Sequence, residues 1–140
     1  MESSIETVIK DINMSLPERK LLQLIERTKL SADLKALLSD IVKVTVKIGG
    51  KVLAIGRKIL TFILDLVKTF PAVAMGTIAA LVITAIVGAV PLFGPALATF
   101  LGPILLAIGV TAGALKDFTN DKLQERITAL VDSFRMLVEV

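Results

Sequence analysis

The chain of 140 residues is strongly apolar, with 54% hydrophobic residues, only 4% aromatic residues and a mean hydropathy of +0.80. Its formal net charge is +3, and it contains no cysteine and no histidine, which excludes disulfides and leaves carboxylates as the main metal ligands. No nucleophile is paired with a base in a recognisable motif, so we expect a non-enzymatic protein without a cofactor or a metal.

Residues 1–30 are predicted to form a short helical N-terminal module. Its first helix is indicated by apolar residues at helical spacing, namely Ile5, Val8, Ile9 and Ile12. The sequence Ser15-Leu16-Pro17-Glu18 then matches a capping box, in which Ser15 and Glu18 satisfy exposed backbone amides at a helix start. A second helix is therefore expected to begin there and to end near Lys29.

Residues 31–70 are predicted to form a long basic amphipathic helix. Apolar residues recur four and three apart, and the apolar arc covers about two thirds of the circumference, against the ~100° that a surface helix needs. Such a helix is buried on more than one side, either at the headgroup boundary of a membrane or in a helix bundle. Gly49-Gly50 predicts a bend within it, and Phe70-Pro71 predicts a corner at its end.

The charged face of this predicted helix carries four lysines, Lys43, Lys47, Lys51 and Lys58. Lysines at a membrane surface bind anionic lipid headgroups, and these four are the candidate headgroup ligands. A solvated face of a helix bundle is the alternative interpretation. Nucleic acid is not expected as a partner, because no aromatic residues interleave with the lysines for base stacking.

Residues 69–115 form a run of 47 residues without a charge. About 20 helical residues cross a bilayer core of roughly 30 Å, so the run fits two spans, 71–90 and 96–115, joined by a turn at 91–95. The turn residues are Pro91, Gly94 and Pro95. The predicted fold class is an all-α integral membrane protein, in which a transmembrane helical hairpin over 71–115 is flanked by amphipathic helices.

Within the predicted hairpin, small residues four apart indicate close helix packing, namely Gly76 with Ala80 and Gly109 with Gly113. Thr77 and Thr84 lie seven apart on one helix face and are the candidate pore-lining residues. The alternative for both threonines is a hydrogen bond to the backbone of their own helix.

Residues 116–140 are predicted to form an amphipathic C-terminal helix that packs on another helix of the same chain or of a neighbouring copy. Its apolar stripe consists of Leu123, Ile127, Leu130, Phe134 and Leu137. Basic residues precede the first predicted span and follow the second. We therefore expect an integral membrane location with both termini in the cytoplasm.

This organisation predicts an oligomeric membrane-permeabilising protein, because two spans enclose a pore only after assembly. The arrangement of a hydrophobic hairpin beside amphipathic helices resembles holins and the hairpin of pore-forming colicins. The expected partners are the lipid bilayer, anionic headgroups and further copies of the chain. Two alternatives stay open: a non-enzymatic membrane-anchored scaffold, immunity or regulatory protein, and a water-soluble helical bundle that hides its hairpin until triggered.

Overall fold

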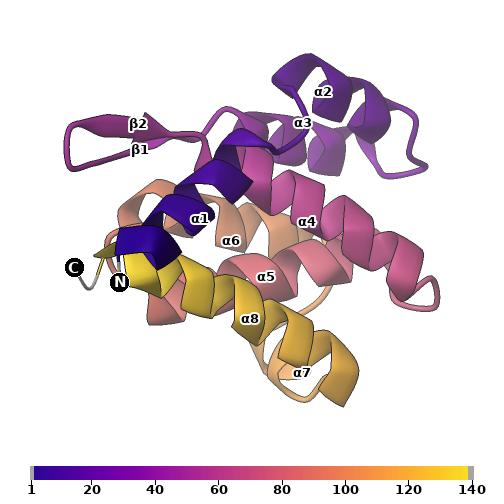
Figure 1. Ribbon diagram of the computed structural model, residues 1–140. Coiled ribbons are helices and arrows are strands. Elements are labelled where there is room, and N and C mark those ends of the chain that lie inside the picture. Colours follow the sequence, from indigo (N-terminus) through magenta and orange to yellow (C-terminus); the bar gives the residue numbers. More distant parts are fainter. Residues whose placement is uncertain (1, 139–140) are drawn as a thin grey trace.

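The computed structural model describes residues 2–138, which form eight helices and one β-hairpin (Figure 1). The N-terminal half contains α1 (Glu2–Asn13), α2 (Glu18–Glu26), α3 (Ala32–Val42), β1 (Val46–Ile48), β2 (Lys51–Leu53) and α4 (Ile55–Thr69). The C-terminal half contains α5 (Met75–Ala89), α6 (Gly94–Ile108), α7 (Ala112–Lys116) and α8 (Asp121–Val138). The helical character that the sequence predicts is therefore confirmed.

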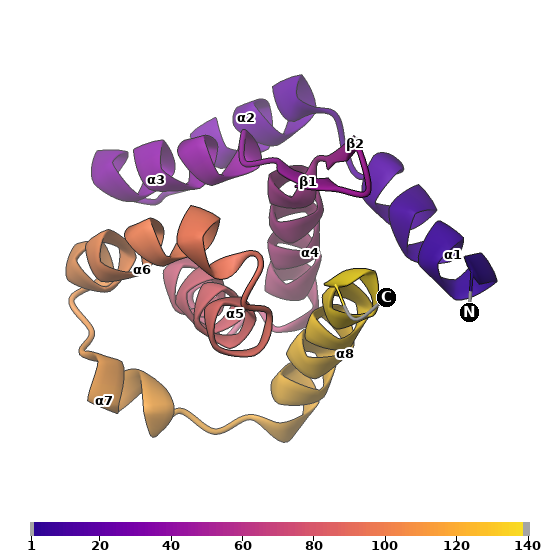
Figure 2. The ribbon, with the colours of Figure 1, turned by 90° about the vertical axis from the view of Figure 1, so that its left-hand side faces the viewer.

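Helix α5 lies at the centre of a helix bundle, between α4, α6 and α8 (Figure 2). Its buried residues occupy most of the helix circumference, and they are Met75, Gly76, Ile78, Ala79, Ala80, Leu81, Val82, Ile83 and Ile86. A helix that is apolar all round belongs either in a protein core or in a membrane. Here the apolar helix α6 and the amphipathic helices α4 and α8 supply the apolar environment.

The prediction of an integral membrane protein with two spanning helices is wrong for the part of the chain that the structure describes. No helix within residues 2–138 is long and apolar enough to cross a membrane. Helices α5 and α6 have 15 residues each, which makes them about 22 Å long, against a bilayer core of roughly 30 Å. The predicted membrane location, with its channel and pore-forming character, is corrected accordingly.

The helices of the charge-free run are shorter than the length of the run suggests, because three breaks interrupt it. Pro71 keeps Phe70 out of helical geometry (φ −123°, ψ 66°), so the predicted corner at Phe70-Pro71 is confirmed and α5 begins only at Met75. A turn that includes Pro91 separates α5 from α6. Gly109 ends α6 in the left-handed conformation, with φ of 71°.

The segment 31–70, which the spacing predicts as one helix, is divided into α3, a β-hairpin and α4. Gly49 and Gly50 have φ of 60° and 80°, and positive φ at both central residues is what a type I′ hairpin turn requires. The two strands pair antiparallel, with Val46 opposite Leu53. The break at these glycines was predicted, but as a bend within a helix rather than as a hairpin.

The predicted capping box at Ser15 is also corrected. Helix α2 begins at Glu18 after Pro17, which makes no side-chain cap, and the Ser15 hydroxyl instead donates to Asp11 O at 3.4 Å. Arg57 of α4 holds this loop by donating to the carbonyl oxygens of Ser15 at 2.8 Å and Leu16 at 3.0 Å. The loop is therefore shaped by a long-range contact rather than by local capping.

Helix α8 packs on α5 and α1 through the predicted apolar stripe. All five predicted stripe residues are buried, and Phe134 meets Phe93 edge to face at a centroid distance of 5.1 Å. Arg126 also forms an ion pair with Asp65 of α4 at 2.8 Å. The predicted amphipathic C-terminal helix is observed as α8, and it packs on other helices of the same chain. Residues 139–140 lie outside the described residues.

Candidate functional site

The acidic residues that the structure describes do not gather into a metal-ligating cluster. Within residues 2–138, no group of three or more acidic, histidine or cysteine side chains lies close enough to hold a metal ion. An exposed salt bridge between Asp65 and Arg126 links α4 with α8. The candidate sites are therefore apolar surfaces and pockets.

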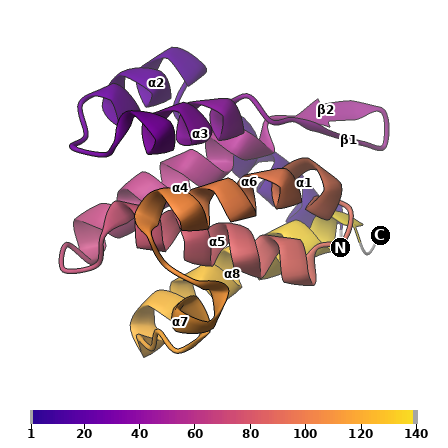
Figure 3. The same ribbon diagram turned by 180° about the vertical axis from the view of Figure 1, so that it is seen from behind.

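The four candidate headgroup lysines do not share one helical stripe. Lys43 caps the C-terminus of α3, Lys47 lies in β1, Lys51 lies in β2 and Lys58 lies in α4. The two strand lysines are exposed on the β-hairpin, which projects from the bundle (Figures 1 and 3). Lys58 is half-buried. The predicted continuous basic face is replaced by a basic hairpin and a separate lysine on the bundle.

The small residues predicted to mediate helix packing have different surroundings. Gly76 is buried where α5 meets α6 and α3, and a Cβ there would lie 2.5 Å from Ile108 Cγ2. Ala80 is buried one turn later. Gly109 and Gly113 lie at the end of α6 and in α7, and neither makes a close helix approach.

The turn and pore candidates also take specific places. Pro91 lies in the turn after α5, while Gly94 and Pro95 form the first turn of α6. Thr77 is half-buried on α5. Thr84 lines a pocket between α5, α6, α7 and α8 rather than a pore.

Helix α6 turns an uncharged stripe away from the bundle. Its core side is anchored by Leu97 and Ile104, while the opposite side is exposed and consists of Pro95, Ala98, Thr99, Gly102, Pro103 and Leu106. Leu106 is 84% exposed, more than any other large apolar residue recorded in the described part of the chain. Exposed apolar surface on a helix is a candidate interaction site.

A groove runs between this stripe and α3. Its α3 wall is formed by residues at one-face helical spacing, Asp33, Ala36, Leu37 and Asp40, together with Ser31. Its α6 wall is formed by Pro103, Leu106 and Ala107, and the groove has a volume of about 510 Å³. The apolar residues that line the groove, which we call its floor, are Ala36, Leu37, Pro103, Leu106 and Ala107, and the two aspartates of the α3 wall, which we call its rim, are exposed.

Local sequence explains how α3 presents this wall. Ser31 caps α3 by accepting a hydrogen bond from Leu34 N at 3.2 Å, so the helix begins at Ala32. Leu34, Leu38 and Ile41 are buried against the bundle. Because these residues fix the inner face, the stripe that contains Asp33 and Asp40 points outward beside α6.

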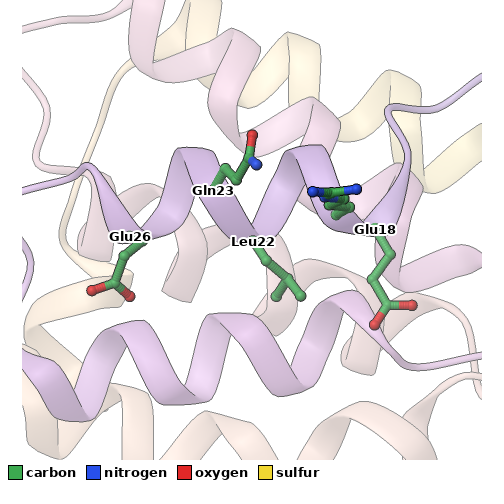
Figure 4. Close-up of a pocket in the computed structure, with 5 residues that line it drawn as sticks. Glu18, Leu22, Gln23 and Glu26 are labelled. Atoms are coloured by element: carbon green, nitrogen blue, oxygen red, sulfur yellow. The ribbon is translucent and has the colours of Figure 1, made fainter.

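A depression on α2 offers less to a ligand. Its lining residues, Glu18, Arg19, Leu22, Gln23 and Glu26, all come from one helix, and Figure 4 shows Gln23 pointing away from the side that carries Leu22. A surface supplied by a single helix gives no enclosing walls. The groove between α3 and α6 is therefore the better candidate site for a macromolecule.

Sequence reasoning missed this groove because it assigned α6 to a membrane. One signal was available: the exposed positions of α6 are small or proline except for Leu106, whereas large side chains occupy its inner positions. A lipid-facing helix surface is instead rich in large apolar residues.

Comparisons with protein-family models, with curated proteins and with solved structures find no match to the chain.

Proposed function

We propose that this protein is a non-enzymatic interaction protein, with a scaffold, immunity or regulatory role, that binds a basic amphipathic helix of another protein in the groove between α3 and α6. The observation that carries the proposal is the exposure of Leu106 beside two rim aspartates. Membrane permeabilisation is not proposed, because it requires membrane-spanning helices and none is found within residues 2–138.

The shape of the groove favours a helix as the occupant. Two helical walls with an apolar floor accept the apolar face of a third helix, whose anchors recur at helical spacing. Gly102 and Pro103 keep the outer surface of α6 low beside Leu106, since neither adds a long side chain. A partner helix can therefore approach this wall closely without a steric clash.

The charge of the rim favours a basic partner. Asp33 and Asp40 are seven residues apart on one face of α3, so lysines or arginines two turns apart on a partner helix lie within reach of both. Such exposed pairs add little affinity, but like charges on a wrong partner are repelled. The floor then supplies most of the binding energy and the rim supplies the selectivity.

A synthetic helical peptide tests this proposal directly. The probe carries leucines at helical spacing with flanking lysines and a fluorescent label, and binding to the full chain is followed by fluorescence anisotropy. Burial of one leucine side chain is worth roughly 1.5–3 kcal/mol, so Leu106→Ser should weaken binding at least about tenfold. Met14→Ser is the matched control, because Met14 is 74% exposed and lies outside the groove.

The rim is tested with charge. Asp33→Asn with Asp40→Asn should weaken binding by a few-fold and reduce its dependence on salt, because exposed ion pairs are worth roughly 0.2–1 kcal/mol each. A peptide with the same leucines but flanking glutamates should bind more weakly than the lysine peptide. Equal binding of both peptides, or equal losses in the Leu106 and Met14 variants, would exclude the groove as the binding site.

Self-association through the same groove is the competing outcome, because the sequence also predicts a homo-oligomer. Analytical ultracentrifugation of the full chain separates the two. A monomer that binds the peptide supports the proposal. An oligomer that Leu106→Ser dissociates and Met14→Ser preserves would mean that a second copy, rather than a different protein, occupies the groove.

A further inference from the structure

A second pocket, on a different face from the groove, is formed where four helices meet. Its walls come from α5 (Leu81, Thr84, Ala85), α6 (Leu101, Leu105), α7 (Leu115, Lys116) and α8 (Gln124), together with Phe118 in the preceding loop. Figure 2 shows α7 and α8 beside α5 and α6 at this corner. The pocket has a volume of about 220 Å³ and is mainly apolar.

The chain builds the outer wall of the pocket through two local signals. Gly109 ends α6 in the left-handed conformation, and Thr111 caps α7 by accepting a hydrogen bond from Ala114 N at 3.1 Å. The chain therefore turns back toward α5, and Leu115 becomes buried. Lys116, the next residue, stays exposed at the edge of the pocket.

Thr84 differs from the two threonines of α4. Thr61 and Thr69 of α4 donate to the carbonyl oxygens four residues earlier, at 2.7 Å and 3.1 Å. The Oγ1 atom of Thr84 is buried and has no hydrogen-bond partner within the described residues. A buried hydroxyl without a partner destabilises the folded state, so this position gains from a ligand that supplies one.

The polar groups of the pocket define the ligand class. Lys116 supplies a positive charge at the edge, and Gln124 supplies an amide, while no acidic residue is among the described residues that line the pocket. The apolar walls are supplied by four leucines, Leu81, Leu101, Leu105 and Leu115, together with Ala85 and Phe118. The matching ligand has an apolar chain, an anionic end and one further hydrogen-bonding group.

We propose that this pocket binds a small hydroxylated fatty acid, with its chain against the leucines, its carboxylate at Lys116 and its hydroxyl hydrogen-bonded to Thr84 Oγ1. The volume of about 220 Å³ is below the range of roughly 300–1,000 Å³ that drug-sized ligands occupy, which restricts the ligand to a short or medium chain. A threonine in a helix has two accessible χ1 rotamers, so the Oγ1 atom of Thr84 can turn toward the hydroxyl group of the bound fatty acid.

The test compares two ligands that differ in one oxygen atom. Binding of decanoate and 3-hydroxydecanoate to the full chain is measured by isothermal titration calorimetry, below the concentrations at which either acid forms micelles. One hydrogen bond to Thr84 predicts a preference for the hydroxylated acid of roughly two- to tenfold. Binding should also raise the thermal midpoint, and the rise should grow with the logarithm of the ligand concentration above the dissociation constant.

Substitutions in and near the pocket test whether the preference for the hydroxylated acid arises there. Thr84→Val keeps the side-chain shape and should abolish the preference for the hydroxylated acid, whereas Thr77→Val on the same helix is the control that should preserve it. Lys116→Gln should weaken both acids by roughly two- to fivefold, because an exposed ion pair contributes modestly. The unliganded Thr84→Val protein should fold at least as stably as the original, since the unpaired hydroxyl is removed.

Three results would overturn the proposal: no binding of either acid, equal binding of both by the original chain, or a preference that survives in Thr84→Val. None of these results bears on the groove between α3 and α6. The residues of the two sites do not overlap, so the pocket and the proposed partner surface succeed or fail separately.

Discussion

Gly56 is the position where a single added carbon tests the packing of the bundle most sharply. It is buried in the first turn of α4, and a Cβ built there would overlap Ile41 O and lie 2.9 Å from Val42 O. Both atoms belong to the backbone at the end of α3, so no side-chain rotation relieves the overlap. The Gly56 amide also donates to Val44 O at 3.0 Å, and separation of the helices would break this bond.

The expected cost of Gly56→Ala combines three effects. Overpacking of a tight interior costs roughly 1–3 kcal/mol, and loss of one backbone hydrogen bond costs about 0.5–1.5 kcal/mol. The higher helix propensity of alanine offsets up to about 1 kcal/mol. The free energy of unfolding should therefore fall by about 2 kcal/mol.

Gly88→Ala is the matched control for this substitution. Gly88 is an exposed residue of α5, and a Cβ there meets nothing within 4 Å, so alanine should stabilise the protein by up to about 1 kcal/mol. Because the chain has no tryptophan or tyrosine, unfolding in urea is followed by far-ultraviolet circular dichroism. Equal stability of the two variants would refute the close approach of α3 and α4.

Two further predictions concern helix capping and the ion pair between α4 and α8. Ser31→Ala should lower the free energy of unfolding by about 1 kcal/mol, because Ser31 caps the N-terminus of α3. Ser15→Ala should cost less, because Ser15 does not cap α2 and its hydrogen bond to Asp11 O is long, at 3.4 Å; equal losses in urea titrations would contradict this assignment. In a double-mutant cycle, Asp65→Asn and Arg126→Gln should show a coupling of roughly 0.2–1 kcal/mol that disappears in high salt. A larger coupling that salt leaves unchanged would show that the pair is shielded from solvent.

The sequence predicts most of the helices because their periodic stripes are long and unambiguous. The stripe from Leu123 to Leu137 packs as expected on the bundle, and Pro71 ends α4 where its steric effect on Phe70 requires. Gly49-Gly50 also breaks the chain where expected. The hairpin was missed because valines and isoleucines beside these glycines fit both a helical stripe and short strands.

The environment of the charge-free run could not be read from its composition. An all-round apolar helix such as α5 satisfies the same pattern in a membrane and in a protein core, and periodicity does not separate them. The decisive features are lengths and partners: two helices of 15 residues each, and amphipathic helices that cover α5. Those partners come from positions far apart in the sequence, so local reasoning does not identify them.

The candidate sites depend on the same long-range placement. Asp33 and Leu106 are more than seventy positions apart, and their shared groove exists only because α3 packs beside α6. Thr84 was singled out from the sequence for a pore wall, and the structure gives it a pocket. Residue type and spacing therefore identified the Thr84 hydroxyl as unusual. The residues that surround it could be identified only from the fold.

Site-specific photo-crosslinking in the native host tests the central claim most directly. A photoreactive amino acid replaces Leu106 in the groove or, as a control, Met14 outside it, and mass spectrometry identifies the crosslinked peptide. The account predicts that position 106 crosslinks to a basic amphipathic helix of a different protein and that position 14 does not. Crosslinks from position 106 only to another copy of this chain, or equal crosslinking of one protein from both positions, would contradict it.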